Sequence, residues 1–309
     1  MKDRSLAKYL IWSFALAWPI QGLASYFALQ GKMQLFQLIM VGCMFAPLLA
    51  VLLSGIGLKG MGWGLELKGK WGWILAAWLV PIGLSLLGAL LYFLVFPEQA
   101  DFSGEPYRAQ LVAAAGEAGA AEAVAELEAK GISLQILGLI SIAQAVTYAP
   151  LINTFAALGE EAGWRGAMLP RLKRRFGKTG GRLAGGVIWG VWHWPVMILA
   201  GYEYGLRYWG APVLGPVVFC LFTTALGILL DICYEKTGSI WAPSLAHGAI
   251  NAAAGIPLLF LRPEYADQMI LGPCSMGLVA GLPLLALALV ALLRDRGEQA
   301  QAPAPGEAA

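Results

Sequence analysis

Residues 160–165 read EEAGWR and follow a long apolar segment, residues 132–158. Glu161 and Arg165 are four residues apart with the acid first, which is the favourable order for an ion pair along a helix. Glu160 points about 100° away from Glu161 around a helix of 3.6 residues per turn. The spacing therefore predicts that Arg165 neutralises Glu161 while Glu160 faces elsewhere. Taken alone, the stretch is equally consistent with a charged helix end at a membrane surface.

The composition indicates that this helix crosses a membrane. Of 309 residues, 59% are hydrophobic and 13% are charged, whereas a soluble domain carries about 25% charged residues. A spanning helix needs roughly 20 apolar residues. Eight segments approach that requirement, namely residues 9–29, 35–57, 71–96, 132–158, 183–201, 211–232, 238–258 and 272–293. Because open sheet edges cannot face lipid, the sequence predicts an all-α polytopic membrane protein. We expect one transmembrane domain over residues 1–296 and a disordered polar tail over residues 297–309.

The lysines and arginines are distributed unevenly between the two sides of this arrangement. With the N-terminus in the cytosol, 16 fall on the inner side and 5 on the outer side. The asymmetry predicts that both termini are cytosolic, and we expect a multi-pass protein of the prokaryotic cell membrane. The basic inner loop, residues 171–182, is interpreted as this topology signal and as a contact for anionic headgroups, with a groove for a substrate tail as the secondary interpretation. The acidic outer loop, residues 97–131, predicts a solvated helix in its second half, which is rich in Ala and Glu.

The two histidines of the chain lie inside predicted spans. His193 is about 15 Å deep at 1.5 Å per residue, and His247 is about 13 Å deep. Asn251 follows His247 by four residues and shares its helix face. Each of these groups could alone be an interhelical hydrogen-bonding residue. Their matched depth favours one site with Glu160, provided that the helix after residue 132 tilts, bends at Pro150 or begins outside the membrane core.

These residue types suit hydrolysis of an acyl bond. A buried glutamate and a histidine can hold and deprotonate a water molecule, and a second histidine and an asparagine can donate hydrogen bonds to an oxyanion. One glutamate and two histidines could also hold a metal ion, but there is no HExxH motif and no spacing that demands zinc. We therefore expect no metal and no cofactor. No spacing of the four cysteines suggests a disulfide framework or a zinc site.

Three motifs in this order resemble those of the CPBP family, the CAAX proteases and bacteriocin-processing or abortive-infection proteins, which include the Ras-converting CAAX endopeptidases. The motifs are Glu160-Glu161-xxx-Arg165, Trp189-xxx-His193 and His247-xxx-Asn251, and the similarity covers roughly residues 130 to 260. The resemblance implies an intramembrane glutamic endopeptidase. It implies that Glu160 and His193 activate the water, that His247 and Asn251 form the oxyanion hole, and that Glu161 and Arg165 support them.

One departure concerns the second motif, in which Trp189 stands where the family commonly has phenylalanine. Tryptophan keeps an aromatic wall, so this departure puts the pocket shape in doubt rather than the catalysis. The implied partners are membrane lipids and a peptide or protein substrate at the membrane, prenylated and of the CAAX type for only part of the family. No nucleic-acid-binding module is visible, and nothing in the pattern indicates the oligomeric state. The rival interpretation is a non-enzymatic membrane scaffold or a transporter. The enzyme is favoured because all four candidate catalytic residues are present, namely Glu160, His193, His247 and Asn251. No internal symmetry of the transporter kind is visible.

Overall fold

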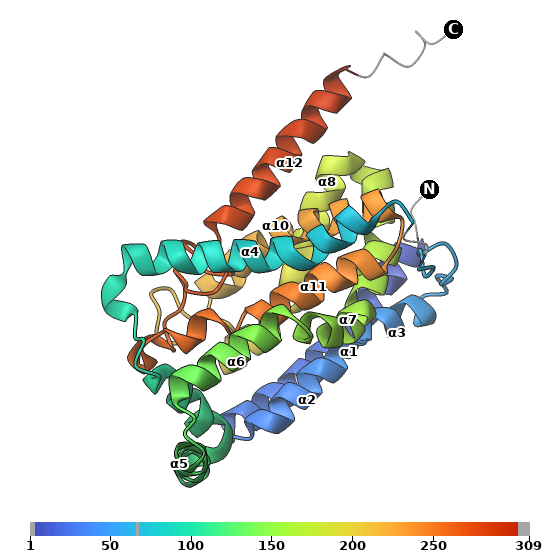
Figure 1. Cartoon of the computed structure of the whole chain (residues 1–309). Helices are drawn as coiled ribbons and strands as arrows, with labels where there is room; N and C mark the ends of the chain where they lie inside the picture. Colours follow the sequence, from blue (N-terminus) through green and yellow to red (C-terminus); the bar gives the residue numbers. More distant parts are fainter. Residues whose placement is uncertain (1–3, 66–67, 302–309) are drawn as a thin grey trace, which may run out of the picture.

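The computed structural model describes residues 4–65 and 68–301 and is all-helical, as predicted. Within those residues it contains helices, turns and loops but no strand, and one isolated bridge pairs Ala100 with Leu261. The helices are α1 (Arg4–Leu29), α2 (Met33–Cys43), α3 (Ala46–Leu53), α4 (Trp71–Val95), η1 (Pro97–Gln99), α5 (Glu105–Ala129), α6 (Leu134–Val146), α7 (Ala149–Glu161), η2 (Ala162–Met168), α8 (Leu169–Trp192), α9 (Trp194–Ala200), α10 (Leu214–Thr237), α11 (Trp241–Ala253), η3 (Pro257–Leu259), η4 (Pro263–Tyr265) and α12 (Leu282–Gln301) (Figure 1). The segment η2 is a π-helix that continues α7 into α8 without a loop.

Several of these helices are long and apolar enough to cross a membrane. By length and composition four described runs qualify: Met33–Leu53, Trp71–Val95, Ala149–Ala200 and Leu214–Thr237. A fifth is reached if α5 and α6, which are bent by 98° relative to each other, count as one broken span. The predicted total of eight spans is not established by these runs and stays a prediction.

The predicted span 132–158 is interrupted in the structure. Helix α6 ends at Val146 and α7 begins at Ala149, with Pro150 in its first turn. Proline has no backbone N–H and disfavours helical geometry in the residue before it, so a new helix start here fits the sequence. The break lies at the place where a bend was expected, and α7 then leads directly to Glu160.

Two other predicted spans have different boundaries. Of residues 238–258, the helix α11 takes only the 13 residues Trp241–Ala253. Residues 272–281 form turns, and α12 begins at Leu282 and runs into the predicted polar tail as far as Gln301. The rest of that tail, residues 302–309, lies outside the described residues.

A turn inside α8 brings two helical legs side by side. Gly177 has non-helical angles, φ 72° and ψ 175°, which glycine adopts at no steric cost. After this turn the chain folds back, since a Cβ atom on Gly181 would lie 2.6 Å from the backbone nitrogen of Lys173. The returning leg then packs closely on α10, where a Cβ atom on Gly186 would lie 2.3 Å from the Cα atom of Thr224. The small residues in this leg therefore serve close helix packing, as their positions in the apolar segments suggest.

Helix α11 packs chiefly against α7 and α4. A Cβ atom on Gly248 would lie 2.7 Å from both the carbonyl oxygen of Pro150 and the nitrogen of Thr154 in α7. Only glycine fits this contact, and it lies next to His247. The backbones of α7 and α11 therefore approach closely at the level of the predicted motif residues.

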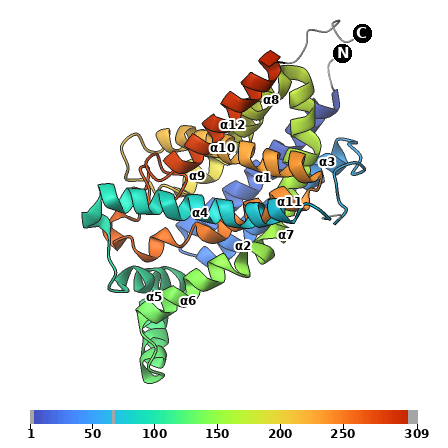
Figure 2. The same cartoon turned by 45° about the horizontal axis from the view of Figure 1, so that its top comes forward.

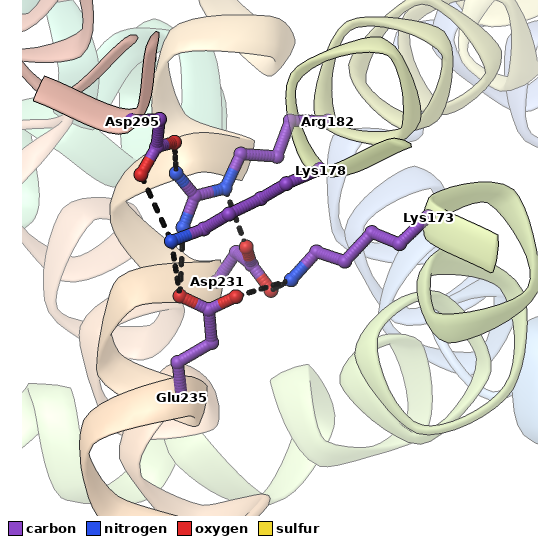
Figure 3. Close-up of polar contacts among 6 residues, drawn as sticks. All are labelled: Lys173, Lys178, Arg182, Asp231, Glu235 and Asp295. Carbon is purple, nitrogen blue, oxygen red and sulfur yellow. Dashed lines mark hydrogen bonds and ion pairs between the residues drawn. The ribbon is translucent and has the colours of Figure 1, made fainter. Parts of the chain in front are cut away.

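An ion-pair cluster joins the two legs of α8 to α10 and α12 (Figure 3). Three basic and three acidic side chains contribute, and they are Lys173, Lys178, Arg182, Asp231, Glu235 and Asp295. Arg182 is at the centre, because each of its three guanidinium nitrogens contacts a different carboxylate. Three bases of the loop predicted to contact lipid headgroups are thus paired within the protein.

The acid-rich segment between α4 and α6 lies at the other end of the molecule from the turn in α8 (Figure 1, Figure 2). Its second half is helical, as the Ala- and Glu-rich composition predicts, and α5 is broken once at Gly116. Helix α12 packs on α10, α4 and α8 and runs toward the same end of the molecule as the turn in α8 (Figure 1, Figure 2).

Candidate active site

The two adjacent carboxylates end α7 and have different surroundings. Arg165 donates from Nη1 to Oε1 of Glu161 over 3.0 Å, and both side chains are buried. The pair predicted from the four-residue spacing is therefore present. The guanidinium of Arg165 also stacks over the ring of Trp189, 4.7 Å from its centroid.

Glu160 faces a different environment, although it is also buried, with 2% of its surface exposed. Its Oε2 atom accepts two hydrogen bonds, from the indole nitrogens of Trp164 at 3.0 Å and Trp189 at 2.8 Å. No hydrogen bond to its Oε1 atom is present among the described residues, and Glu160 lines a cavity. Two N–H donors on one oxygen hold the carboxylate in place and leave its second oxygen available.

His247 on α11 is oriented by Glu161. Its Nδ1 atom lies 2.8 Å from Glu161 Oε1, the oxygen that also accepts from Arg165. A carboxylate oxygen accepts hydrogen bonds, so Nδ1 carries the hydrogen and Nε2 is the nitrogen left for other contacts. Glu161 therefore joins the first and third motifs through a direct contact.

His193 lies at the break between α8 and α9. Its Nδ1 atom is 3.0 Å from the backbone oxygen of Trp189, which again places the hydrogen on Nδ1 and leaves Nε2 available. The edges of the His193 ring contact Trp192 and Phe219, with ring centroids 4.7 and 5.0 Å away. These contacts fix the plane of the imidazole.

The break itself is stabilised by a side chain of α1. Gln21 is fully buried, and its Nε2 donates to the backbone oxygen of Trp192 over 2.8 Å. Its Oε1 accepts from the backbone nitrogen of Val196 at 3.3 Å. Both backbone groups would lack partners where the helix is interrupted, so Gln21 satisfies them and holds His193 between two helix ends.

One cavity of about 430 Å³ brings the predicted catalytic residues together. Glu160, His193, His247 and Asn251 all line it, whereas Glu161 and Arg165 do not and lie behind it. Much of the remaining wall is apolar, and its larger side chains are those of Phe36, Met40, Val41, Met44, Trp192, Phe219, Phe222, Leu226, Ile250 and Met276. The arrangement thus presents a carboxylate, two imidazoles and an amide to a mostly apolar space.

The metal alternative has no matching ligand group. Among the residues that the structure describes, no set of three or more His, Cys, Asp or Glu side chains is placed to hold a metal ion. The four cysteines are free thiols, and Cys43, Cys233 and Cys274 are buried. Indole N–H groups hold Glu160, a backbone oxygen holds His193, and Glu161 holds His247.

Some functional contacts were not predicted from the sequence. Trp164 is one helical turn after Glu160, so its spacing could have identified it as a donor. Trp189 was expected only as an aromatic wall, but its indole N–H adds a hydrogen bond to Glu160 that phenylalanine cannot make. Gln21 and Glu203, which also lines the cavity, have no local sequence signal.

An all-helical chain with several long apolar helices and this buried cavity has the features of an integral membrane hydrolase. Residues 142–253 match the family model described as type II CAAX prenyl endopeptidase Rce1-like. The match contains all three motifs and supports the CPBP family of CAAX proteases, so the resemblance noted in the sequence is confirmed. It supports a membrane endopeptidase that acts on a protein or peptide at the membrane. A search of the curated proteins found no match to the chain.

Proposed function

We propose that this protein is an intramembrane glutamic endopeptidase that hydrolyses a peptide bond of a membrane-associated substrate near the cytosolic face. The observation that carries the proposal is the Glu160 carboxylate, held through Oε2 by two indole N–H groups and open to the cavity through its other oxygen. An acid held in this way can receive a proton without moving. No comparable arrangement is needed for a scaffold.

In this mechanism Glu160 and His193 hold a water molecule between them. The neutral His193 accepts a hydrogen bond at Nε2, because its Nδ1 hydrogen is directed to the oxygen of Trp189. As the water oxygen attacks the peptide carbonyl, its proton passes to Glu160. The same proton then protonates the leaving amine, the C–N bond breaks, and the carboxyl product forms.

The opposite side of the carbonyl group is assigned to His247 and Asn251. The Asn251 amide donates a hydrogen bond to the developing oxyanion, and His247 donates from Nε2 as an imidazolium. Donation from Nε2 needs a hydrogen on both ring nitrogens, because Nδ1 is already directed to Glu161. Glu161 and Arg165 are thus positioning residues, which hold His247 without contacting the substrate.

The substrate is proposed to be a peptide with an apolar or lipid-bearing portion. Helices α2 and α10 supply an apolar wall to the cavity through residues such as Phe36, Met40 and Phe219. Such a wall suits an aliphatic chain better than a polar peptide segment. A prenylated CAAX-type peptide fits this apolar wall, and the matching family is described as type II CAAX prenyl endopeptidase Rce1-like.

For the topology we propose eight crossings, cytosolic termini and one domain over residues 1–296. The turn at Gly177 supports more than the four crossings counted by length, since it divides the 52-residue run Ala149–Ala200 into two legs. The basic turn in α8 and the acidic segment around α5 lie at opposite ends of the molecule, which supports the orientation (Figure 1).

The proposal is tested by reconstituting the purified protein in liposomes with a mixture of lipid-anchored synthetic peptides. We expect new peptide termini, detected by mass spectrometry, in the presence of excess chelator as well as in its absence. Cleavage that is lost on chelation and restored by zinc would favour the metal-dependent alternative. A complete lack of new termini, together with transport or retention of the peptides, would support the transporter or scaffold instead.

Glu161→Gln is expected to reduce kcat about 10²-fold, the cost of removing one oxyanion donor, while KM changes little. The neutral amide oxygen is a weaker acceptor for the Nδ1 hydrogen of His247 than the carboxylate oxygen, although the side chain keeps its shape. Steady-state kinetics on the best peptide from the mixture measures both constants. An exposed carboxylate of α5, changed by Glu122→Gln, is the matched control. Equal kcat values for the two variants would refute the positioning role of Glu161.

A further inference from the structure

A second carboxylate lines the same cavity and has no part in the mechanism above. Glu203 lies in the segment between α9 and α10, and it lines the cavity together with its neighbour Tyr202. The Tyr202 hydroxyl donates a hydrogen bond to the Glu203 carboxylate. No lysine, arginine or histidine in the described part of the chain is ion-paired with Glu203.

The backbone at Glu203 is in an unfavourable conformation. Among the described residues it alone combines a side chain with a positive φ, which is 73°. This region is disfavoured for residues with a Cβ atom, and a long side chain there is uncommon. Glycine would fit the turn better, so a glutamate in this conformation points to a use for its carboxylate.

The neighbouring residues hold this conformation on both sides. The nitrogen of Gly205 donates to the oxygen of Gly201 over 2.8 Å, closing the turn around Glu203. Tyr204 is anchored twice, by its hydroxyl to the oxygen of Met276 at 2.7 Å and by its backbone oxygen to the nitrogen of Met269 at 2.9 Å. The backbone of the turn is therefore held in place, with Glu203 among the residues that line the cavity.

The charge at the cavity defines what Glu203 could bind. Two carboxylates, Glu160 and Glu203, line the cavity, and no lysine or arginine is among its lining residues. Burial raises the pKa of Glu203 to about 7, although the hydrogen bond from Tyr202 opposes this effect. Glu203 is half-buried and lacks a cationic partner among the described residues, so its carboxylate gains from an incoming cation, whereas an anionic group would be repelled by both acids.

We propose that Glu203 forms a specificity subsite that binds a cationic side chain, lysine or arginine, of the substrate peptide. This proposal rests on the proposed endopeptidase function in one respect: that function makes the bound peptide a substrate. The carboxylate accepts hydrogen bonds from the ammonium or guanidinium group, and the Tyr202 hydroxyl holds it in position. The substrate is then an apolar or lipid-bearing peptide with a basic residue near the bond that is cleaved.

The test measures binding and does not depend on cleavage. The parent protein is Glu160→Gln in detergent micelles, which removes the other cavity carboxylate. The probes are two acetylated and amidated peptides, Leu-Arg-Leu and Leu-citrulline-Leu, because citrulline keeps the shape of arginine without its charge. Isothermal titration calorimetry is expected to show about 10- to 100-fold tighter binding of the arginine peptide, the range for one charge-assisted pair.

The variant that carries the test adds Glu203→Gln to this parent. We expect the preference for arginine to disappear while binding of the citrulline peptide stays within about twofold. If this variant does not fold, Glu203→Asn replaces it, because asparagine tolerates a positive φ and also lacks the charge. Equal binding of both peptides by the parent, or a preference that survives in the variant, would overturn the subsite.

The outcome is separable from that of the proposed function. Wild-type protein that cleaves the citrulline and arginine forms of a lipid-anchored peptide, with a lower KM for the arginine form, supports both proposals. A binding preference for arginine without any cleavage supports the cation subsite and overturns only the endopeptidase proposal.

Discussion

Glu160→Gln is expected to reduce peptide cleavage about 10²- to 10⁴-fold, the contribution of a general base, without unfolding the protein. The glutamine side chain has nearly the shape of glutamate, and its amide oxygen can accept the hydrogen bonds from Trp164 and Trp189. Its NH2 group then occupies the position of the free carboxylate oxygen. An amide at that position can donate to a water molecule but cannot take its proton.

The measurement compares turnover of a lipid-anchored peptide with the thermal unfolding midpoint in the same detergent. Glu160→Ala is a less informative variant, because it leaves two buried indole N–H groups without an acceptor and lowers stability as well. Trp189→Phe is a graded control: it keeps the aromatic wall, removes one of the two donors to Glu160, and should cause a smaller loss than Glu160→Gln. Turnover of Glu160→Gln at the wild-type rate would remove Glu160 as the base.

The local parts of this site could be predicted from the sequence. The pairing of Glu161 with Arg165 follows from a four-residue spacing in a helix, and the same geometry turns Glu160 to another face. A common cavity was expected for Glu160, His193, His247 and Asn251, which all line it. Placing an ionisable group inside an apolar helix costs free energy, so several such groups at matched depth indicate one functional site. Each of these inferences needs only helix geometry and the cost of burying a polar group.

The contacts that join separate helices could not be predicted in this way. The bond between His247 and Glu161 connects residues 86 positions apart, and the bonds of Gln21 reach across more than 170 positions. Periodicity carries no information about which helices become neighbours, so such partners are visible only in the fold. The positive φ of Glu203 is equally hidden, because no glycine or asparagine marks the position.

The span boundaries show a related limit. A hydropathy window averages over about 19 residues, so it passes over the interruption at Thr147 and Tyr148 and over the turns before Leu282. The basic loop, residues 171–182, shows a second limit of sequence analysis. Its charge was interpreted as a topology signal and a lipid contact. A count of charges does not distinguish an exposed basic side chain from one that pairs with an acid on another helix. Lys173, Lys178 and Arg182 meet such acids in the ion-pair cluster (Figure 3).

Arg182→Met is expected to destabilise the protein by about 3–5 kcal/mol, the cost of leaving buried charges without their partner. Arg182 and Asp231 are each 1% exposed at the side chain, and Asp295 is 8% exposed. Without the guanidinium, the ion pairs that the described residues offer are Asp231 with Lys173 and Asp295 with Lys178. These lysines are themselves partly exposed, so their attraction is screened by solvent and cannot replace the buried contact.

The thermal unfolding midpoint in detergent measures this loss, and Arg175→Met on the same helix is the matched control, because Arg175 is exposed. A triple variant distinguishes two causes of the destabilisation, namely buried acids left without their partner and lost packing of the Arg182 side chain. Arg182→Met combined with Asp231→Leu and Asp295→Leu removes the buried acids together with their partner, and it should recover much of the stability, since apolar replacement of a whole buried ion-pair group is often neutral. If the triple variant is as unstable as the single one, the effect comes from packing of α8 on α10 and α12. If Arg182→Met behaves like Arg175→Met, the cluster contributes no net stability, and its place at the junction of three helices must then be explained by orientation of α12 alone.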